Sequence, residues 1–186
     1  MASIFPSQRP IGAVLEGVDA AGPLLFAAKS QDASRLQRLL SQQKYRESAM
    51  DDSLRICDEA DVIDGRRYVN ARAIPNLEFI IQTAAENAQP APLAAAIAFA
   101  KSSQLRPAVY ISRATVAAAI TSGDPVLCEA LQTGDPGFVN LVNLDLGHSL
   151  YPLALARLQG KDFICDGLLR NGADPSRATP RMFQPR

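Results

Sequence analysis

The sequence is poor in aromatic residues and has no excess charge of either sign. Among its 186 residues there is no tryptophan, and aromatic residues make up only 6%. Together with the many alanines, this scarcity favours thin, closely packed helical layers over a large aromatic core. Basic and acidic residues both number 19, so the formal net charge is zero. Because no basic footprint is present, we expect no nucleic-acid partner.

Long apolar runs and targeting signals are also missing. The most apolar stretch, residues 92–100, is far shorter than the roughly 20 residues that a membrane-spanning helix needs. The opening residues, MASIFPSQRPIGAVLEG, lack the basic start, apolar core and cleavage site of a signal peptide. We therefore expect an intracellular protein of the cytoplasm, with the nucleus as an alternative, and no membrane partner.

Cysteine and histidine are too few and too scattered for the common metal and disulfide frameworks. Cys57, Cys128 and Cys165 are odd in number and lack C-x-x-C spacing, so neither a zinc site nor a disulfide framework is indicated. An acidic cluster from Asp51 to Asp64 lacks the spacing and the closing glutamate of a calcium-binding EF-hand loop. No Gly-rich phosphate loop is present either. We expect no metal and no cofactor.

A short template recurs along the chain, and each copy is anchored on an alanine. The anchors are Ala27, Ala84, Ala119 and Ala156, separated by 57, 35 and 37 residues. Each copy has apolar or small residues at fixed offsets, in a pattern typical of a short helix, a tight turn and a second helix. Since so short a pair cannot bury its apolar face alone, we expect consecutive pairs to stack into a solenoid.

Two positions break the apolar pattern, Thr83 in the second copy and Gln132 in the third. Cys128 and Cys165 occupy one template position, where the first two copies carry leucine. We therefore expect both cysteines to act as core residues rather than as nucleophiles. The turn position, four residues after each anchor, is occupied in chain order by Gln31, Ala88, Gly123 and Gly160.

The last copy resembles an ankyrin repeat. Pro152–Leu153, Ala156, Gly160 and Gly172–Asp174 are similar to the T-P-L-H-x-A start, the glycine turn and the G-A-D end of that family. Proline suits a first helical turn, and glycine suits the left-handed residue that ends a helix. The family's histidine is missing from all four copies. The resemblance implies an all-α, ankyrin-like helical-repeat solenoid with an enlarged connection after the first repeat.

We predict a single domain over residues 1–186. The enlarged connection is expected to hold one short helix, capped by Asp51 or Asp52 and ending near Ala60, and then a turn at Asp64–Gly65. Met182 and Phe183 of the tail are expected to cover the end of the stack. The predicted segments are an N-terminal cap at 1–21, repeat 1 at 22–42, an insert at 43–76, repeat 2 at 77–104, repeat 3 at 113–135, repeat 4 at 150–175 and a C-terminal tail at 176–186.

Long connections before the inner helices are expected to project as fingers beside the concave face of the stack. The resemblance to ankyrin repeats implies a non-catalytic scaffold that binds a protein partner through this face and the fingers. An alternative interpretation of the finger tyrosines is that they pack the finger bases. The fingers span 66–75, 106–113 and 144–151, and they carry side chains of types common at interfaces, namely Arg67, Tyr68, Tyr110, Arg113, His148 and Tyr151.

A second function fits some of the same residues. The alternative is a small cofactor-free enzyme, such as an isomerase or cyclase, that acts on an apolar small molecule in a pocket roofed by the fingers. His148, the only histidine, would be the general base, and Tyr151, Tyr110 and Arg113 would supply the other groups. The simpler interpretation of His148 is an exposed loop residue or a helix cap.

Overall fold

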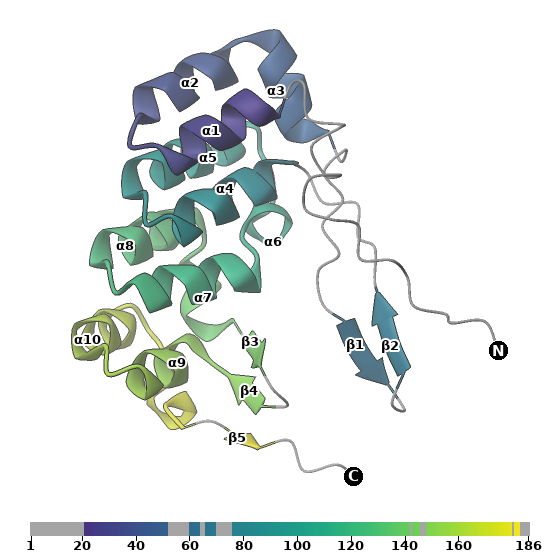
Figure 1. Cartoon of the computed structure of the whole chain (residues 1–186). Coiled ribbons are helices and arrows are strands. Elements are labelled where there is room, and N and C mark those ends of the chain that lie inside the picture. Colours follow the sequence, from purple (N-terminus) through teal and green to yellow (C-terminus); the bar gives the residue numbers. More distant parts are fainter. Residues whose placement is uncertain are drawn as a thin grey trace, which may run out of the picture.

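The computed structural model describes residues 21–51, 60–63, 66–69, 76–141, 143–145, 148–179 and 181–182. Its body is built from helices, as the sequence predicts, and these follow one another in pairs joined by short turns (Figure 1). The four pairs are α1 (Gly22–Lys29) with α2 (Ala33–Ser41), α4 (Asn76–Glu86) with α5 (Pro90–Ser102), α7 (Arg113–Ser122) with α8 (Pro125–Gly134), and α9 (Pro152–Leu158) with α10 (Asp162–Arg170).

Shorter elements lie between and after these pairs. Helix α3 packs on α2 and α4, and α6 packs on α4, while the strands form small antiparallel sheets. These elements are α3 (Gln43–Met50), β1 (Ala60–Ile63), β2 (Arg66–Val69), α6 (Pro107–Tyr110), the 3-10 helix η2 (Pro136–Asn140), β3 (Asn143–Asp145), β4 (His148–Leu150), the 3-10 helix η3 (Pro175–Arg177) and β5 (Arg181–Met182).

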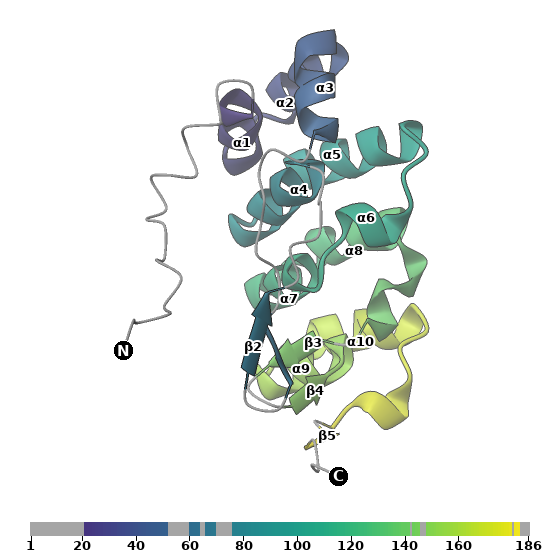
Figure 2. The same cartoon turned by 90° about the vertical axis from the view of Figure 1, so that its right-hand side faces the viewer.

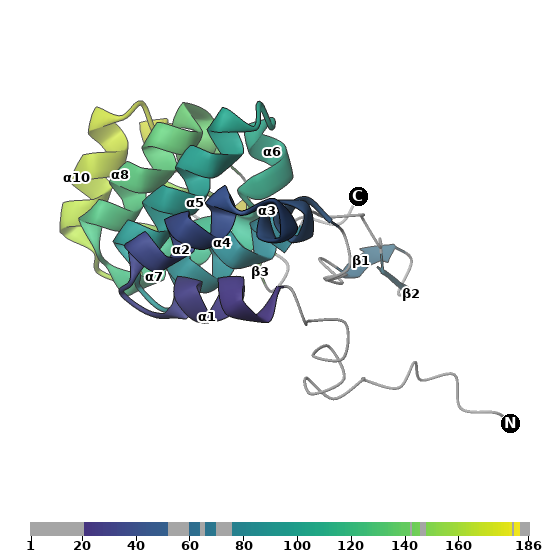
Figure 3. The same cartoon turned by 90° about the horizontal axis from the view of Figure 1, so that it is seen from above.

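The helix pairs form two layers. In the inner layer α1, α4, α7 and α9 contact one another in succession, and in the outer layer α2, α5, α8 and α10 do the same. Seen from above, the outer helices are displaced progressively to one side, which leaves α10 at the edge of the stack (Figure 3). All four anchor alanines, Ala27, Ala84, Ala119 and Ala156, are 0% exposed. Their small side chains allow the inner helices to approach closely, so the body has one continuous core.

The turn position of the template has a left-handed backbone in three copies. The φ angles are 51° at Ala88, 75° at Gly123 and 65° at Gly160. In the second and fourth copies the carbonyl of the anchor alanine accepts a hydrogen bond of 2.9 Å from the backbone N–H that follows the turn residue, which is the Schellman pattern. Glycine adopts this conformation freely, whereas the Cβ atom of Ala88 makes it costly.

Side-chain caps and prolines set where the helices begin. The Asp32 carboxylate accepts a hydrogen bond of 2.8 Å from the backbone N–H of Arg35 at the start of α2. At α7, the Ser112 hydroxyl accepts one of 3.1 Å from Thr115. These caps satisfy N–H groups that have no partner inside the helix. Proline occupies the first turn of α1, α5, α8 and α9, where its missing N–H costs nothing.

The connection after the first pair differs from the prediction. It holds a helix that was not predicted, α3, which ends at Met50 and has Asp51 as its C-terminal cap residue. The helix predicted from Asp51 or Asp52 falls mostly outside the described residues, and its predicted end, Ala60, starts strand β1. The β1 and β2 strands pair antiparallel, with Ile63 opposite Arg66; the predicted turn at Asp64–Gly65 lies outside the described residues. A helix at α3 is hard to predict because only Ala49 among its residues is buried and no side chain caps its N-terminus.

The two ends of this insertion are tied together. The backbone N–H of Asn76 donates to the Asp51 carbonyl at 2.7 Å, and the Asn76 side-chain amide donates to the Ser48 carbonyl at 2.7 Å. Asn76 is itself 0% exposed. Because both contacts join α3 to the first residue of α4, the chain leaves the stack and returns to it at one place. The insertion therefore does not interrupt the stacking of α1 on α4.

Candidate interaction surfaces

The side that carries the predicted fingers is shown in Figure 2, with α6 and the β3–β4 hairpin toward the viewer. Arg67 and Tyr68 lie in β2, and His148 lies in β4 opposite Asp145. Their side chains are outside the described part of the chain. Among the predicted finger residues, only Tyr110, Arg113 and Tyr151 have side chains that the structure describes.

Tyr110 is part of the core. Its side chain is 1% exposed, and its hydroxyl donates a hydrogen bond of 3.2 Å to the backbone carbonyl of Gly134 at the end of α8. Burial, and to a smaller extent the charge of Asp135, raises the pKa of the phenol. The ring therefore packs the base of its finger and joins α6 to α8, with no face free for a partner.

Tyr151 and Arg113 lie at the starts of the last two inner helices. Tyr151 is half-buried, and the Arg177 guanidinium lies 4.5 Å from the centre of its ring, a cation–π distance. Arg177 also pairs with the Asp174 carboxylate, with 3.3 Å between Nε and Oδ2. Arg113 is the half-buried first residue of α7. The C-terminal segment thus braces the finger that carries Tyr151.

The tail also extends the last finger into a three-stranded sheet. Strand β5 pairs antiparallel with β4, which places Met182 opposite His148 in the backbone register. Phe183, which was predicted to cover the end of the stack, lies outside the described residues. The segment after α10 therefore returns to the finger side of the molecule.

A groove that the sequence did not predict lies on the outer layer, between α8 and α10. Its volume is about 430 Å³. Helix α8 forms one wall and α10 the other, and the fully buried ring of Phe138 from η2 contributes to its lining. The groove is lined by Pro125, Cys128, Glu129, Gln132, Phe138, Phe163, Ile164, Gly167, Leu168, Arg170 and Asn171.

Phe163 is an exposed aromatic ring on the rim of this groove. It is 64% exposed, although it lies on a helix that buries Ile164, Cys165 and Leu168. Phe26, near the other end of the stack, is similarly exposed at 60%, but the Arg35 guanidinium lies 5.0 Å from its ring centre. No such contact is recorded for Phe163 within the described part of the chain.

Gly167 opens the middle of the α10 wall. A Cβ atom at this position would meet no other atom within 4 Å. At the same distance from their anchor alanines, α5 and α8 carry buried Ala95 and Ala130, whereas α2 carries exposed Arg38. A glycine inside a helix costs about 1 kcal/mol relative to alanine. The chain therefore has a less stable helix at the point where the groove is open.

Gln132 places an unsatisfied amide in the α8 wall. The equivalent positions of the other copies are apolar: Leu40, Ile97 and Leu169. Its Oε1 atom is buried, yet it has no hydrogen-bond partner among the described atoms. A buried polar atom left without a partner costs about 1–3 kcal/mol.

Cys128 lies beside Gln132 in the same wall and is not an activated thiol. Burial, reinforced by the charges of Asp124 and Glu129, raises its pKa to about 11. The thiol is therefore protonated at neutral pH, whereas a nucleophilic cysteine needs a lowered pKa. Cys165 is 6% exposed, and burial raises its pKa as well. Both thiols behave as apolar packing groups.

The groove thus gathers three departures from ordinary packing: an exposed ring at Phe163, a helix-interior glycine at Gly167 and an unsatisfied amide at Gln132. Departures of this kind concentrate at functional sites. Only Gln132 was visible in advance, as an exception to the repeat template. The exposure of Phe163 and the open space at Gly167 depend on the residues across the groove, and the spacing of the sequence does not show those neighbours.

Comparison with known proteins gave no significant match to any family model, curated protein or solved structure. None of the described helices is long and apolar enough to cross a membrane. Nowhere in the described segments do three or more His, Cys, Asp or Glu side chains form a group that could hold a metal ion. A functional interpretation therefore has to come from the surfaces of this chain.

Proposed function

We propose that this protein is a non-catalytic protein-interaction module, built as an ankyrin-like solenoid, that binds a partner through the groove between α8 and α10. The finger side, with Arg67, Arg113 and Tyr151, is a second contact surface in this proposal. The observation that carries it is the coincidence in one groove of the exposed ring of Phe163, the open space over Gly167 and the buried Gln132 oxygen that lacks a hydrogen-bond donor.

The ankyrin-like part of the proposal is supported by the repeat template. Its anchor alanines are all buried, and its turn position is left-handed at Ala88, Gly123 and Gly160. The Gly172 backbone is also left-handed, with φ of 90°, and the backbone N–H of Ala173 donates to the Leu168 carbonyl at 2.9 Å. This agrees with the role that the G-A-D end of an ankyrin repeat implies.

A protein partner fits the groove better than a small molecule does. Sites for small molecules enclose most of the ligand surface, whereas this groove has Phe163, 64% exposed, on its rim. Its buried Phe138 and Leu168 combine with charged Glu129 and Arg170. An apolar centre with a polar rim and an exposed aromatic anchor is the usual composition of a protein interface.

Site-specific photo-crosslinking tests this proposal. Phe163 is replaced with a photoreactive phenylalanine analogue, and Phe26, equally exposed at the other end of the stack, receives the same analogue as a matched control. We expect protein–protein crosslinks from position 163 and far fewer from position 26, in cells that express the full chain. Equal crosslinking from both positions would show that exposure alone decides the contacts and would count against the groove.

The finger surface needs its own variant. Arg67→Glu combined with Arg113→Glu reverses two finger charges and leaves the groove intact. If the fingers contribute to the same complex, crosslinking from position 163 to the partner should weaken in this variant. Unchanged crosslinking would restrict the interaction to the groove and remove the fingers from the proposal.

A further inference from the structure

We propose that the occupant of the α8–α10 groove is a second copy of this chain, with the two α10 helices antiparallel across a two-fold axis. This inference rests on the proposed function, because it names the partner of the same groove. Two features of α10 support it. The first is a projecting ring next to an open space on one helix face, and the second is a set of opposite charges at the two ends of the helix.

The ring and the space are complementary to each other. Phe163 and Gly167 are four residues apart in α10, so they lie on the same helix face one turn apart. Phe163 is 64% exposed, and the position of a Cβ atom on Gly167 is open for at least 4 Å. In a two-fold interface each contact occurs twice. The ring of each copy can therefore enter the space over Gly167 of its partner.

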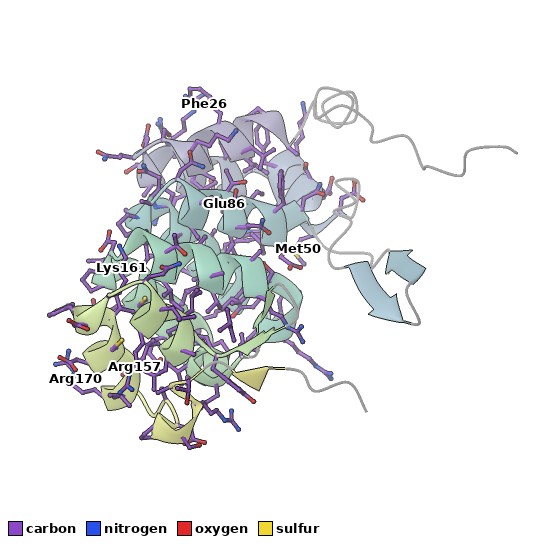
Figure 4. All side chains as sticks on the ribbon, turned by 60° about the horizontal axis from the view of Figure 1, so that its bottom comes forward. Phe26, Met50, Glu86, Arg157, Lys161 and Arg170 are labelled. Atoms are coloured by element: carbon purple, nitrogen blue, oxygen red, sulfur yellow. The ribbon has the colours of Figure 1, made fainter. Side chains whose placement is uncertain are left out.

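The charges of α10 favour the same antiparallel arrangement. Asp162 and Asp166 lie toward the start of the helix, and Arg170 is its last residue. All three are exposed, and within the described part of the chain none of them makes an ion pair. Figure 4 shows Arg170 at the outer edge of the stack. An antiparallel pair brings each Arg170 within about one helical turn, ~5 Å along the axis, of Asp162 in the other copy.

The position and overall charge of the molecule permit this contact. Helix α10 lies at the edge of the outer layer, where a second stack can approach it (Figure 3). The formal net charge is zero, so no long-range repulsion keeps two copies apart.

Molar mass in solution tests the proposal directly. We expect sedimentation equilibrium of the full chain to show a rise from the mass of one chain to that of two as concentration increases into the high micromolar range. Phe163→Glu should remain a single chain over the same range. Phe26→Glu, an equally large change at the other end of the stack, should dimerise like the wild type.

Two further variants separate loss of the interface from loss of the fold. Gly167→Leu fills the space and improves the helix, so it should abolish the dimer while raising the unfolding temperature of the monomer. A folded monomer with raised thermal stability supports the proposal, whereas a Gly167→Leu dimer of wild-type affinity overturns it. Circular dichroism of each variant verifies that the helices are retained.

A charge exchange identifies the antiparallel geometry. Asp162→Arg alone places arginine opposite Arg170 of the other copy, and Arg170→Asp alone places two carboxylates opposite each other, so each variant by itself should dimerise at least tenfold more weakly. Mixed in equal amounts, the two variants should form a heterodimer, because both of its charge pairs are again opposite in sign. A mixture that stays as weak as the separate variants overturns the two-fold arrangement.

The inference and the proposed function fail in different ways. A wild-type chain that keeps the mass of one chain throughout the range overturns the second copy as occupant, even where position 163 still crosslinks to another protein. A dimer that Phe163→Glu does not weaken also overturns it, because the contact would lie elsewhere on the molecule. The proposed function fails when position 163 gives no protein crosslink, or no more crosslinking than position 26.

Discussion

Two neighbouring junctions of the outer layer differ sharply, although the same repeat template builds both. Between α5 and α8, a Cβ atom on Gly134 would lie 2.8 Å from Ile97 and 3.0 Å from Ile111, so no space remains. Between α8 and α10, the two helices leave a groove of about 430 Å³, and a Cβ atom on Gly167 would meet nothing within 4 Å. A repeat template sets how helices stack, but the side chains at each junction decide whether it closes.

Polar contacts cross both junctions, but only the open one holds a buried polar atom without a partner among the described residues. The Lys101 ammonium donates to the Thr133 carbonyl at 3.0 Å, and the Tyr110 hydroxyl donates to the Gly134 carbonyl at 3.2 Å. In the open junction the buried Oε1 of Gln132 has no partner among the described residues. Closure of the α5–α8 junction therefore combines filled volume with satisfied polar groups, whereas the groove has an open volume and an unsatisfied side-chain oxygen.

The largest expected effect is a difference in the free energy of unfolding between two truncations. One removes Leu131 from the core at the closed junction, and the other removes the exposed ring of Phe163 at the open junction. Leu131, in α8, is 0% exposed, so Leu131→Ala should lower the free energy of unfolding by about 2–5 kcal/mol. Phe163→Ala, at an exposed position, should change it by less than about 0.5 kcal/mol in the monomer. Urea unfolding at low protein concentration measures both. Similar losses in the two variants would show that the groove is part of the core.

The same substitution in both junctions should have opposite signs. In the closed junction, Gly134→Ala forces a methyl group against the Ile97 and Ile111 side chains, and it should destabilise the fold by about 1–3 kcal/mol. The unfolding midpoint in urea gives the change. A stability equal to that of the wild type would contradict this, because the Ile97 and Ile111 side chains could then move aside without cost.

In the open junction, Gly167→Ala should stabilise the chain by about 1 kcal/mol, because alanine restores helix propensity and its Cβ atom meets nothing. Thermal unfolding of the monomer, at a concentration below dimerisation, measures this gain. The opposite sign from Gly134→Ala is the decisive observation. A loss of stability at Gly167 would place a tight contact where the structure has open space.

The regular part of the fold was predictable because it depends on local rules. A small anchor such as Ala156, a proline at the first helical turn and a glycine such as Gly160 at the turn act within one helix pair, so spacing alone locates them. Helix α3 was not predicted because residues Gln43–Met50 carry neither a side-chain cap nor an apolar stripe. Asn76, which ties the insertion closed, acts across 28 residues of chain.

The candidate site was far less predictable. Tyr110 was a candidate for partner binding because tyrosine is common at interfaces, with packing of the finger base as the alternative. Its side chain is 1% exposed and packed against α8, which agrees with the alternative. Conversely, the sequence of α10 does not tell whether Phe163 or its neighbour Ile164 faces the core. In the structure Ile164 is buried and Phe163 is 64% exposed. Residue type indicates what a side chain can do, whereas its exposure is set by neighbours distant in the sequence.

The smallest expected effect concerns the turns, where the template can be tested without touching either junction. Ala88 has φ of 51° at the position that glycine occupies in the third and fourth copies. Because glycine adopts this conformation without strain, Ala88→Gly should raise the free energy of unfolding by about 0.5–1 kcal/mol. Gly160→Ala, which meets no atom within 4 Å, should lower it by a similar amount, since only the backbone cost remains.

These two variants form a matched pair, because each exchanges one residue type for the other at the same template position. Equal and opposite changes in the urea midpoint would establish that the repeat imposes one backbone conformation on copies whose sequences differ. A gain at Gly160→Ala would contradict this, because alanine would then suit a left-handed turn that the repeat reserves for glycine. The backbone conformation of each turn would then be set by its own neighbouring residues, and the repeat template would apply only to the helices.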